Sequence, residues 1–256
     1  MLLQLWTLWT REVVRFYRQP SRIVGALGSP LLFWLLIGSG LGRSFRTNEP
    51  LAGGYLEYFY PGTLALIVLF TAIFSTISVI EDRQEGFLQG VLVAPVPRTT
   101  IVLGKILGST ALALMQAVVF LFISPFTYGF LGIATLAALV GVLAMLAFGL
   151  SGLGFLLAWR LDSTQGFHAI MNLFLVPMWM LSGALFPASG ATGWIRGLMW
   201  MNPLTYGVSA LRQLIYGHRI PHEPGLAASL LVIGAFGSAA LVAGAWVVQR
   251  DGHRRS

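Results

Sequence analysis

Five long tracts without a charged side chain constrain the fold of this chain more than any other feature of its sequence. They cover residues 23–42, 58–80, 106–159, 163–195 and 224–249. A transmembrane helix needs about 20 mainly apolar residues, so most tracts hold one span and the longest holds two spans with a turn. The sequence therefore predicts an all-α, polytopic membrane protein with six spans, at about 23–41, 61–80, 106–124, 133–158, 167–187 and 226–248.

The composition agrees with this prediction and excludes several classes of protein. Hydrophobic residues make up 56% of the chain and charged residues 10%, against about 45–50% and about 25% in soluble domains. Six spans leave no stretch long enough for a separate soluble domain, so residues 1–256 are predicted to form one transmembrane domain. The chain has no cysteine, which excludes thiolate metal sites, thiol nucleophiles and disulfides.

The N-terminal segment 2–19 is predicted to form an amphipathic helix that lies along the membrane surface before the first span. Arg11, Arg15 and Arg18 supply charge between apolar residues at helical spacing, which are Leu2, Leu5, Trp6, Trp9, Val13, Phe16 and Tyr17. A secretory signal is the alternative, but its charged start would precede its apolar core. The order is reversed here, and this favours the surface helix.

Two connections between spans have patterns of their own. The segment 81–98 combines a charged run, an apolar face and a proline break, which predicts a short amphipathic helix between spans 2 and 3. Such a helix could plug into a groove on a soluble partner or merely anchor the loop, and the residues alone favour neither interpretation. The connection 188–225 contains an apolar run over 194–201 but is too short and too polar for two more spans.

Lysine and arginine are distributed unequally between the two sides of the six-span topology. One side holds 11 of them and the other holds 5. The positive-inside rule places the basic side and both termini in the cytoplasm, as expected of a multi-pass protein of the cell (inner) membrane. The net charge of +7 then serves insertion and contact with anionic lipid, and no nucleic-acid partner is predicted.

The spans lack the groups that power transport in ion-coupled carriers. Such carriers place ionisable residues in the membrane, but no Asp, Glu, Lys or Arg lies near a predicted midplane, and His168 lies near the end of span 5. The Gly104-Lys105 pair is not a phosphate-binding loop, and protease and lipase motifs are absent. The chain is therefore predicted to have no enzymatic activity, cofactor or metal of its own, and its energy source is expected outside the chain.

Six residues in the spans are candidates for a translocation path. Polar groups in a span should face protein or a cavity, and aromatic and methionine side chains suit an amphiphilic cargo. Hydrogen bonding and packing between helices are the equally good alternative for each of them. The candidates are Thr71, Phe74, Ser75, Asn172, Phe174 and Met178.

Two stretches of sequence resemble the membrane subunits of ABC-2 type exporters. The first is the charged cluster 81–85 with the Gly86-Phe87 pair, the run Leu92-Val93-Ala94-Pro95-Val96-Pro97-Arg98 and the Gly104-Lys105 pair. The second is Met201-Asn202-Pro203-Leu204-Thr205-Tyr206, continued to Leu211-Arg212, which is similar to the signature between the last two spans of this family. Their order and spacing extend the resemblance over essentially the whole chain, and the branch that it most resembles includes the daunorubicin-resistance permeases.

The resemblance implies specific roles for residues at the cytoplasmic side. The loop after span 2 would form a coupling helix on an ATPase subunit, formed by Glu81, Asp82, Arg83, Glu85, Gly86 and Leu88, and a smaller contact would come from Arg160 and Asp162. Residues 188–212 would form short helices that re-enter from the outer side, with a helix break at Asn202-Pro203. The signature residues are Asn202, Pro203, Leu204, Tyr206, Leu211 and Arg212. Gln84 and Gly90 depart from the family pattern.

The family also implies the assembly and the activity. Two permease subunits, as a homodimer or as two similar chains, would work with two ABC ATPase subunits that hold the ATP and magnesium. The expected cargo is a hydrophobic or amphipathic small molecule or lipid, because the path carries no charge. A glycan or glycolipid exporter, a membrane scaffold without transport activity and an ion-coupled carrier are the alternatives.

Overall fold

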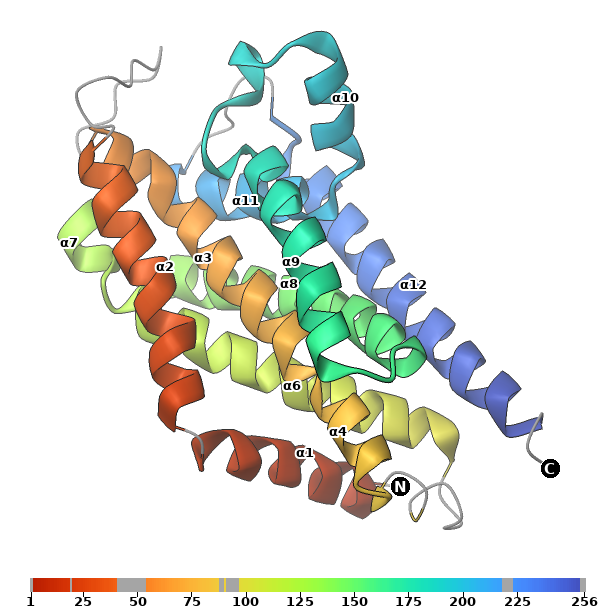
Figure 1. The fold of residues 1–256 in the computed structure, drawn as a ribbon. Helices are drawn as coiled ribbons and strands as arrows, with labels where there is room; N and C mark the ends of the chain where they lie inside the picture. Colours follow the sequence, from red (N-terminus) through yellow and green to blue (C-terminus); the bar gives the residue numbers. More distant parts are fainter. Residues whose placement is uncertain are drawn as a thin grey trace.

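The computed structural model describes residues 2–18, 20–40, 54–87, 90, 97–217 and 223–253. Within these ranges the regular secondary structure is helical and no strand occurs (Figure 1). The predicted all-α fold is therefore confirmed. The helices are α1 (Leu2–Tyr17), α2 (Pro20–Gly40), α3 (Gly54–Ser75), α4 (Ser78–Gln84), α6 (Arg98–Leu121), α7 (Ser124–Tyr128), α8 (Ile133–Arg160), α9 (Thr164–Trp179), α10 (Gly193–Met201), α11 (Pro203–Tyr216) and α12 (Leu226–His253).

Five helical segments are long and apolar enough to cross a membrane. They are Gly54–Gln84, Arg98–Leu121, Ile133–Arg160, Thr164–Ala184 and Leu226–Arg250. Within the described residues, the part of α2 from Gly28 to Gly40 counts as a shorter apolar helix. A polytopic membrane protein is thus supported by five spans, and the sixth, predicted at 23–41, stays a prediction.

Two of these helices begin earlier than the sequence pattern predicts. The second predicted span starts at Pro61, yet α3 begins at Gly54 and continues through this proline. Proline has no N–H to donate to the carbonyl four residues earlier, and here that carbonyl, on Glu57, accepts a hydrogen bond from the Tyr128 hydroxyl. Helix α6 begins at Arg98 instead of 106, because Lys105 is buried in ion pairs and does not end the helix.

The helix bundle has two distinct ends. Helices α1 and α4 lie at one end, here named the α1 end, together with the C-terminal end of α12 (Figure 1). Helices α7, α10 and α11 lie at the opposite end, here named the α10 end. Helix α3 occupies the centre, where it packs against α2, α6, α8 and α9. Nearly all of its residues are buried, so the two ends are held apart by a well-packed core.

Candidate functional site

A cluster of charged side chains joins α1 to α4 at the α1 end. The Arg11 guanidinium donates two hydrogen bonds to the Asp82 carboxylate, at 2.7 and 2.8 Å. The Arg15 guanidinium nitrogens lie 3.1, 3.0 and 3.3 Å from carboxylate oxygens of Asp82, Glu81 and Glu85, respectively. The hydrogen bond to Asp82 raises the pKa of Arg11, so the guanidinium remains charged in this bidentate contact.

Lys105 of α6 completes this cluster from the interior of the bundle. Its amine lies 2.5 Å from a carboxylate oxygen of Glu12, bonds to Asp82 and lies 3.2 Å from the Ser78 hydroxyl. The side chains of Lys105 and Asp82 are only 2% and 0% exposed. Buried charges of this kind persist only when they are paired, so Asp82 is an internal anchor in this structure and does not reach the surface.

Arg83 connects α4 to the loop between α8 and α9. Its guanidinium lies 2.8 Å from the Asp162 carboxylate and donates to the carbonyls of Ala158 and Trp159, at 2.8 and 3.0 Å. The Gln84 amide adds a bond of 2.7 Å to the carbonyl of Asp162. A cation that binds the last carbonyls of a helix caps it favourably. The two segments predicted to contact an ATPase are therefore brought together into one surface.

The exposure of the predicted coupling residues separates them into two groups. Four are exposed and can offer groups to a partner, namely Glu85, Gly86, Arg160 and Asp162. Glu81 and Arg83 are half-buried and Asp82 is buried. Leu88 lies outside the described residues. Gly86 has a φ of +76°, which favours glycine, and it turns the chain away from α4.

Replacing Arg83 by methionine is expected to loosen the end of α8. The change removes two charge-assisted bonds to helix carbonyls, each worth about 1 kcal/mol. Backbone amides over 157–163 should then exchange hydrogen for deuterium about tenfold faster, as measured by mass spectrometry in nanodiscs. Arg160→Met, at an exposed position of the same helix end, is the control. Equal exchange in both variants would contradict this capping role.

At the α10 end, the membrane-spanning segment Thr164–Ala184, predicted as span 5, is interrupted. A π-helix, η1, covers Met180–Ala184 and includes Gly183 with a φ of +81°. Side chains bind the carbonyls that this interruption frees. Asn202 donates to the carbonyl of Met178 at 2.6 Å, and both Tyr58 and Arg212 donate to that of Gly183, at 2.9 and 3.0 Å. Irregular backbone at membrane depth needs such partners.

Arg212 is the centre of a second buried ion pair. It is fully buried, bonds to the carboxylate of Glu223 and lies with its guanidinium carbon 4.2 Å from the centre of the Tyr58 ring. A guanidinium over an aromatic face gains a cation–π interaction. The pair therefore ties α11 to α3 and to the start of the segment that leads into α12.

The other signature residues also have structural roles. The helix breaks at Asn202, as predicted, because its side chain caps α11 with a 3.0 Å bond from the Leu204 amide and Pro203 occupies the first helical turn. The Tyr206 hydroxyl donates to the carbonyl of Trp200 at 2.9 Å, and Leu204 and Leu211 are buried. The signature holds the α10–α11 unit onto the end of span 5.

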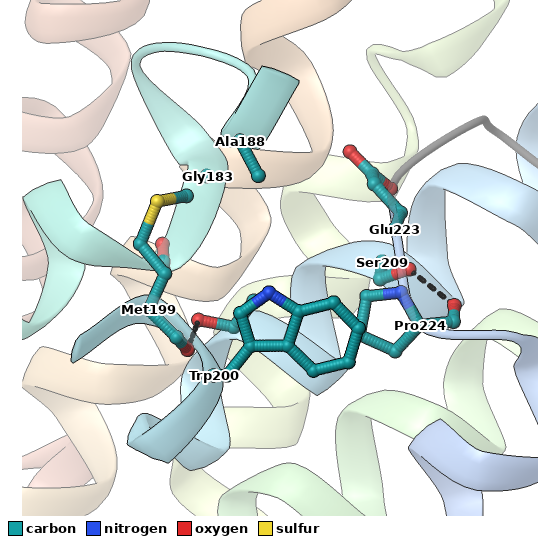
Figure 2. Close-up of a pocket in the computed structure, with 9 residues that line it drawn as sticks. Gly183, Ala188, Met199, Trp200, Ser209, Glu223 and Pro224 are labelled. Carbon is teal, nitrogen blue, oxygen red and sulfur yellow. Dashed lines mark hydrogen bonds between the residues drawn. The ribbon is translucent and has the colours of Figure 1, made fainter. Parts of the chain in front are cut away.

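A small cavity lies beside this unit (Figure 2). Met199 and Trp200 of α10 line one side, and Ser209 and Pro224 meet through a 2.9 Å hydrogen bond on another. The second carboxylate oxygen of Glu223, which also lines the cavity, is buried and has no hydrogen-bond partner among the described residues. The cavity is too narrow for a transported molecule. It lies next to the side chains that bind the carbonyls around η1, which are Tyr58, Asn202 and Arg212 and are here named the clamp around η1.

The six candidates for a translocation path lie in different surroundings. Thr71 is buried and bonds to Gln116 of α6 at 2.6 Å, so it is an interhelical partner in this structure. Ser75 bonds to the carbonyl of Ala72, and Phe74 packs against Phe167 and His168. The remaining three lie on α9, where Met178 is half-buried and the exposed residues are Asn172 and Phe174.

The sequence interpretation missed three members of these clusters. Lys105 and Glu223 border uncharged tracts and Glu12 lies within the predicted N-terminal helix, and the structure buries all three. The Gly104-Lys105 pair lacks the pattern of a phosphate-binding loop and matches the family pattern, and neither observation indicates a buried ion pair. A single charge flanked by apolar residues at helical spacing was the available signal, because such a charge must find a partner when it is buried.

This fold and these polar clusters describe a multi-pass membrane protein in which the span Thr164–Ala184 is interrupted at its end. Comparison with known families identifies it further. Residues 3–216 match the ABC-2 type transporter family. The chain belongs to this family and is a membrane permease subunit, and the family implies an ABC ATPase as the partner.

Several relatives are named transport permeases. The putative transport permease ycf38 of Cyanophora paradoxa is 29% identical over 222 residues, which cover 84% of this chain and 74% of the relative. The inner membrane transport permease YadH of Escherichia coli is 25% identical over 213 residues, which cover 80% of each chain. The probable multidrug ABC transporter permease YbhR of the same species is 26% identical over 161 residues, or 62% of this chain and 44% of the relative.

Proposed function

We propose that this permease exports a hydrophobic or amphipathic small molecule or lipid, powered by two ABC ATPase subunits that dock at the α1 end. The observation that carries the proposal is the ion pair between Arg83 of α4 and Asp162 of the loop between α8 and α9. This pair joins the two segments, and Glu85 and Asp162 then lie on one exposed surface. Their side chains are 57% and 88% exposed. This surface then faces the cytoplasm, together with both termini, as the excess of Lys and Arg on this side favours.

The proposed path runs along α9. This helix is buried only through one stripe at four-residue spacing, which consists of Phe167, Met171, Leu175 and Trp179. The rest of its surface is largely exposed and uncharged, and it includes Asn172 and Phe174. A path without acidic or basic side chains suits an apolar or amphipathic cargo better than an ionic one. The multidrug name of the relative YbhR is in line with this cargo class.

The exposed side of α9 also suggests where a second copy binds. Helices α2 and α9 both pack on α3, and α2 exposes a row of large apolar residues, namely Leu32, Phe33, Leu35 and Leu36. We propose that these two helices form the interface of a homodimer, with the translocation path between the two copies. Closure of the ATPase subunits would then rock spans 1, 2 and 5 through the surface at the α1 end.

The test of the proposed function is ATP hydrolysis by the complex of this permease and its ATPase in lipid nanodiscs. The double variant Glu85→Ala/Gly86→Pro removes an exposed carboxylate and forces a proline onto a φ of +76°, which proline cannot adopt. We expect lipid- or drug-stimulated hydrolysis to fall at least tenfold while the complex still co-purifies. Arg18→Ala, exposed at the end of α1, should hydrolyse ATP like the wild type.

Two results would contradict the proposal. Unchanged stimulated hydrolysis in the double variant would remove the coupling role from this surface. Failure to isolate any ATPase with the wild-type chain would favour the membrane scaffold instead.

Cargo is tested separately by Asn172→Leu, which should weaken transport in vesicles and leave assembly intact. Stimulation by a glycolipid but by no apolar compound would favour the glycan alternative.

A further inference from the structure

Helix α1 packs against α6 at two glycines. A β-carbon at Gly104 would lie 3.0 Å from the Leu8 β-carbon, and one at Gly108 would lie 2.9 Å from the β- and γ-carbons of Glu12. These two glycines are four residues apart and share one face of α6. Only glycine leaves room for such a close approach. Helix α1 therefore packs closely on the face of α6 that Gly104 and Gly108 form, which is here named the seat.

Lys105 lies beside this seat and connects it to α4. Its amine bonds to Glu12 of α1 at 2.5 Å and also to Asp82 of α4, while Arg11 and Arg15 hold Asp82 from the side of α1. Movement of α1 away from α4 would leave the buried Asp82 without two of its three cationic partners. Because unpaired buried charges are strongly disfavoured, the three helices are locked together at this point.

We infer that Gly104, Lys105 and Gly108 form a docking site for α1, and that Lys105 is a positioning residue that makes α1 and α4 move as one body. This inference rests on the proposed function, because the motion is the one that the ATPase subunits impose at α4. It extends the coupling unit from the loop after span 2 to the surface helix at the N-terminus. Arg11 and Arg15 then serve this lock, although the charge count assigned them to lipid.

The inference is tested by the distance between spin labels on α1 and α4. The chain has no cysteine, so Val14→Cys and Gln84→Cys, both at exposed positions, can be labelled selectively. In the wild-type background, the distance distribution should be the same in nucleotide-free and ATP-trapped complexes. Lys105→Met should broaden this distribution and lower stimulated hydrolysis about tenfold, with the ATPase still bound. A shift on ATP trapping in the wild-type background, or an unaltered distribution in Lys105→Met, would overturn the inference.

Two further variants keep the test decisive if Lys105→Met does not fold. Glu12→Gln preserves the shape of the seat and weakens the ion pair, and Gly108→Val displaces Glu12 without removing a charge. Both should broaden the distribution. Gly141→Val is the matched control, since a β-carbon at Gly141 meets no atom within 4 Å. The isolated permease reports on docking alone, so loss of ATPase binding by the wild type would count against the proposed function and not against the seat.

Discussion

Replacement of Arg212 by methionine is expected to destabilise the protein by about 3–5 kcal/mol, because it leaves the Glu223 carboxylate buried without its cation. The same change removes one of the two side-chain donors to the Gly183 carbonyl. Most of the variant protein should then aggregate during heating or during extraction into detergent. The measurement is the temperature at which half of the monodisperse protein is lost, monitored by fluorescence-detected size-exclusion chromatography.

A second change separates the buried charge from the lost packing. In Arg212→Met/Glu223→Gln a neutral amide replaces the carboxylate, so no unpaired charge is buried at residue 223 and part of the stability should return. Arg196→Met is the control at the same end of the bundle, since Arg196 is half-buried and binds only loop carbonyls among its described contacts. A thermal midpoint of Arg212→Met equal to that of the control would refute the proposed role of the pair.

Gly62→Val is expected to have the next largest effect, because α3 touches the interrupted part of span 5 at this residue. A β-carbon at Gly62 would lie 2.5 Å from the Ala184 β-carbon and 2.8 Å from its α-carbon. The backbone of η1 must therefore shift, and the Trp179 side chain would lose its 2.9 Å bond to the Gly62 carbonyl. Overpacking of this kind costs about 1–3 kcal/mol and occasionally more, measured as above.

The clash can be relieved in part from the other side. In Gly62→Ala/Ala184→Gly the two β-carbons no longer meet, although the contact with the α-carbon at 184 remains. We expect this double variant to be more stable than Gly62→Ala alone, and the difference measures the coupling between the two positions. Equal stability of the two variants would show that η1 already moves freely away from α3.

Much of the fold could be predicted from the uncharged tracts, because a bilayer accepts only helices that satisfy their own backbone. The ends of the helices could not be predicted in this way. The sequence pattern predicts the edge of a span at Lys105, yet α6 carries this residue into a buried ion cluster. The pattern also predicts the start of a span at Pro61, yet α3 begins earlier, and the Tyr128 hydroxyl donates to the Glu57 carbonyl in place of the N–H that this proline lacks. Both errors depend on partners that are distant in the sequence.

The candidate site was predictable only as a set of segments. The resemblance indicated the charged run after span 2, but it could not separate the buried Asp82 from the exposed Glu85, because that difference comes from α1, some 70 residues away in the chain. The same holds for the path. Thr71 and Asn172 are both polar residues in spans, and only the packing of α6 on α3 buries the first against Gln116.

The clamp around η1 has a consequence for how such proteins are classified. Asn202 and Arg212 bind backbone carbonyls, which have the same chemistry whatever molecule is carried. A search that relies on residues 201–212 will therefore gather proteins that share a broken helix, and it will mix carriers of unlike molecules. Sorting relatives by what they move should start from the exposed side chains of α9, which line the proposed path and can be substituted without removing a bond to these carbonyls.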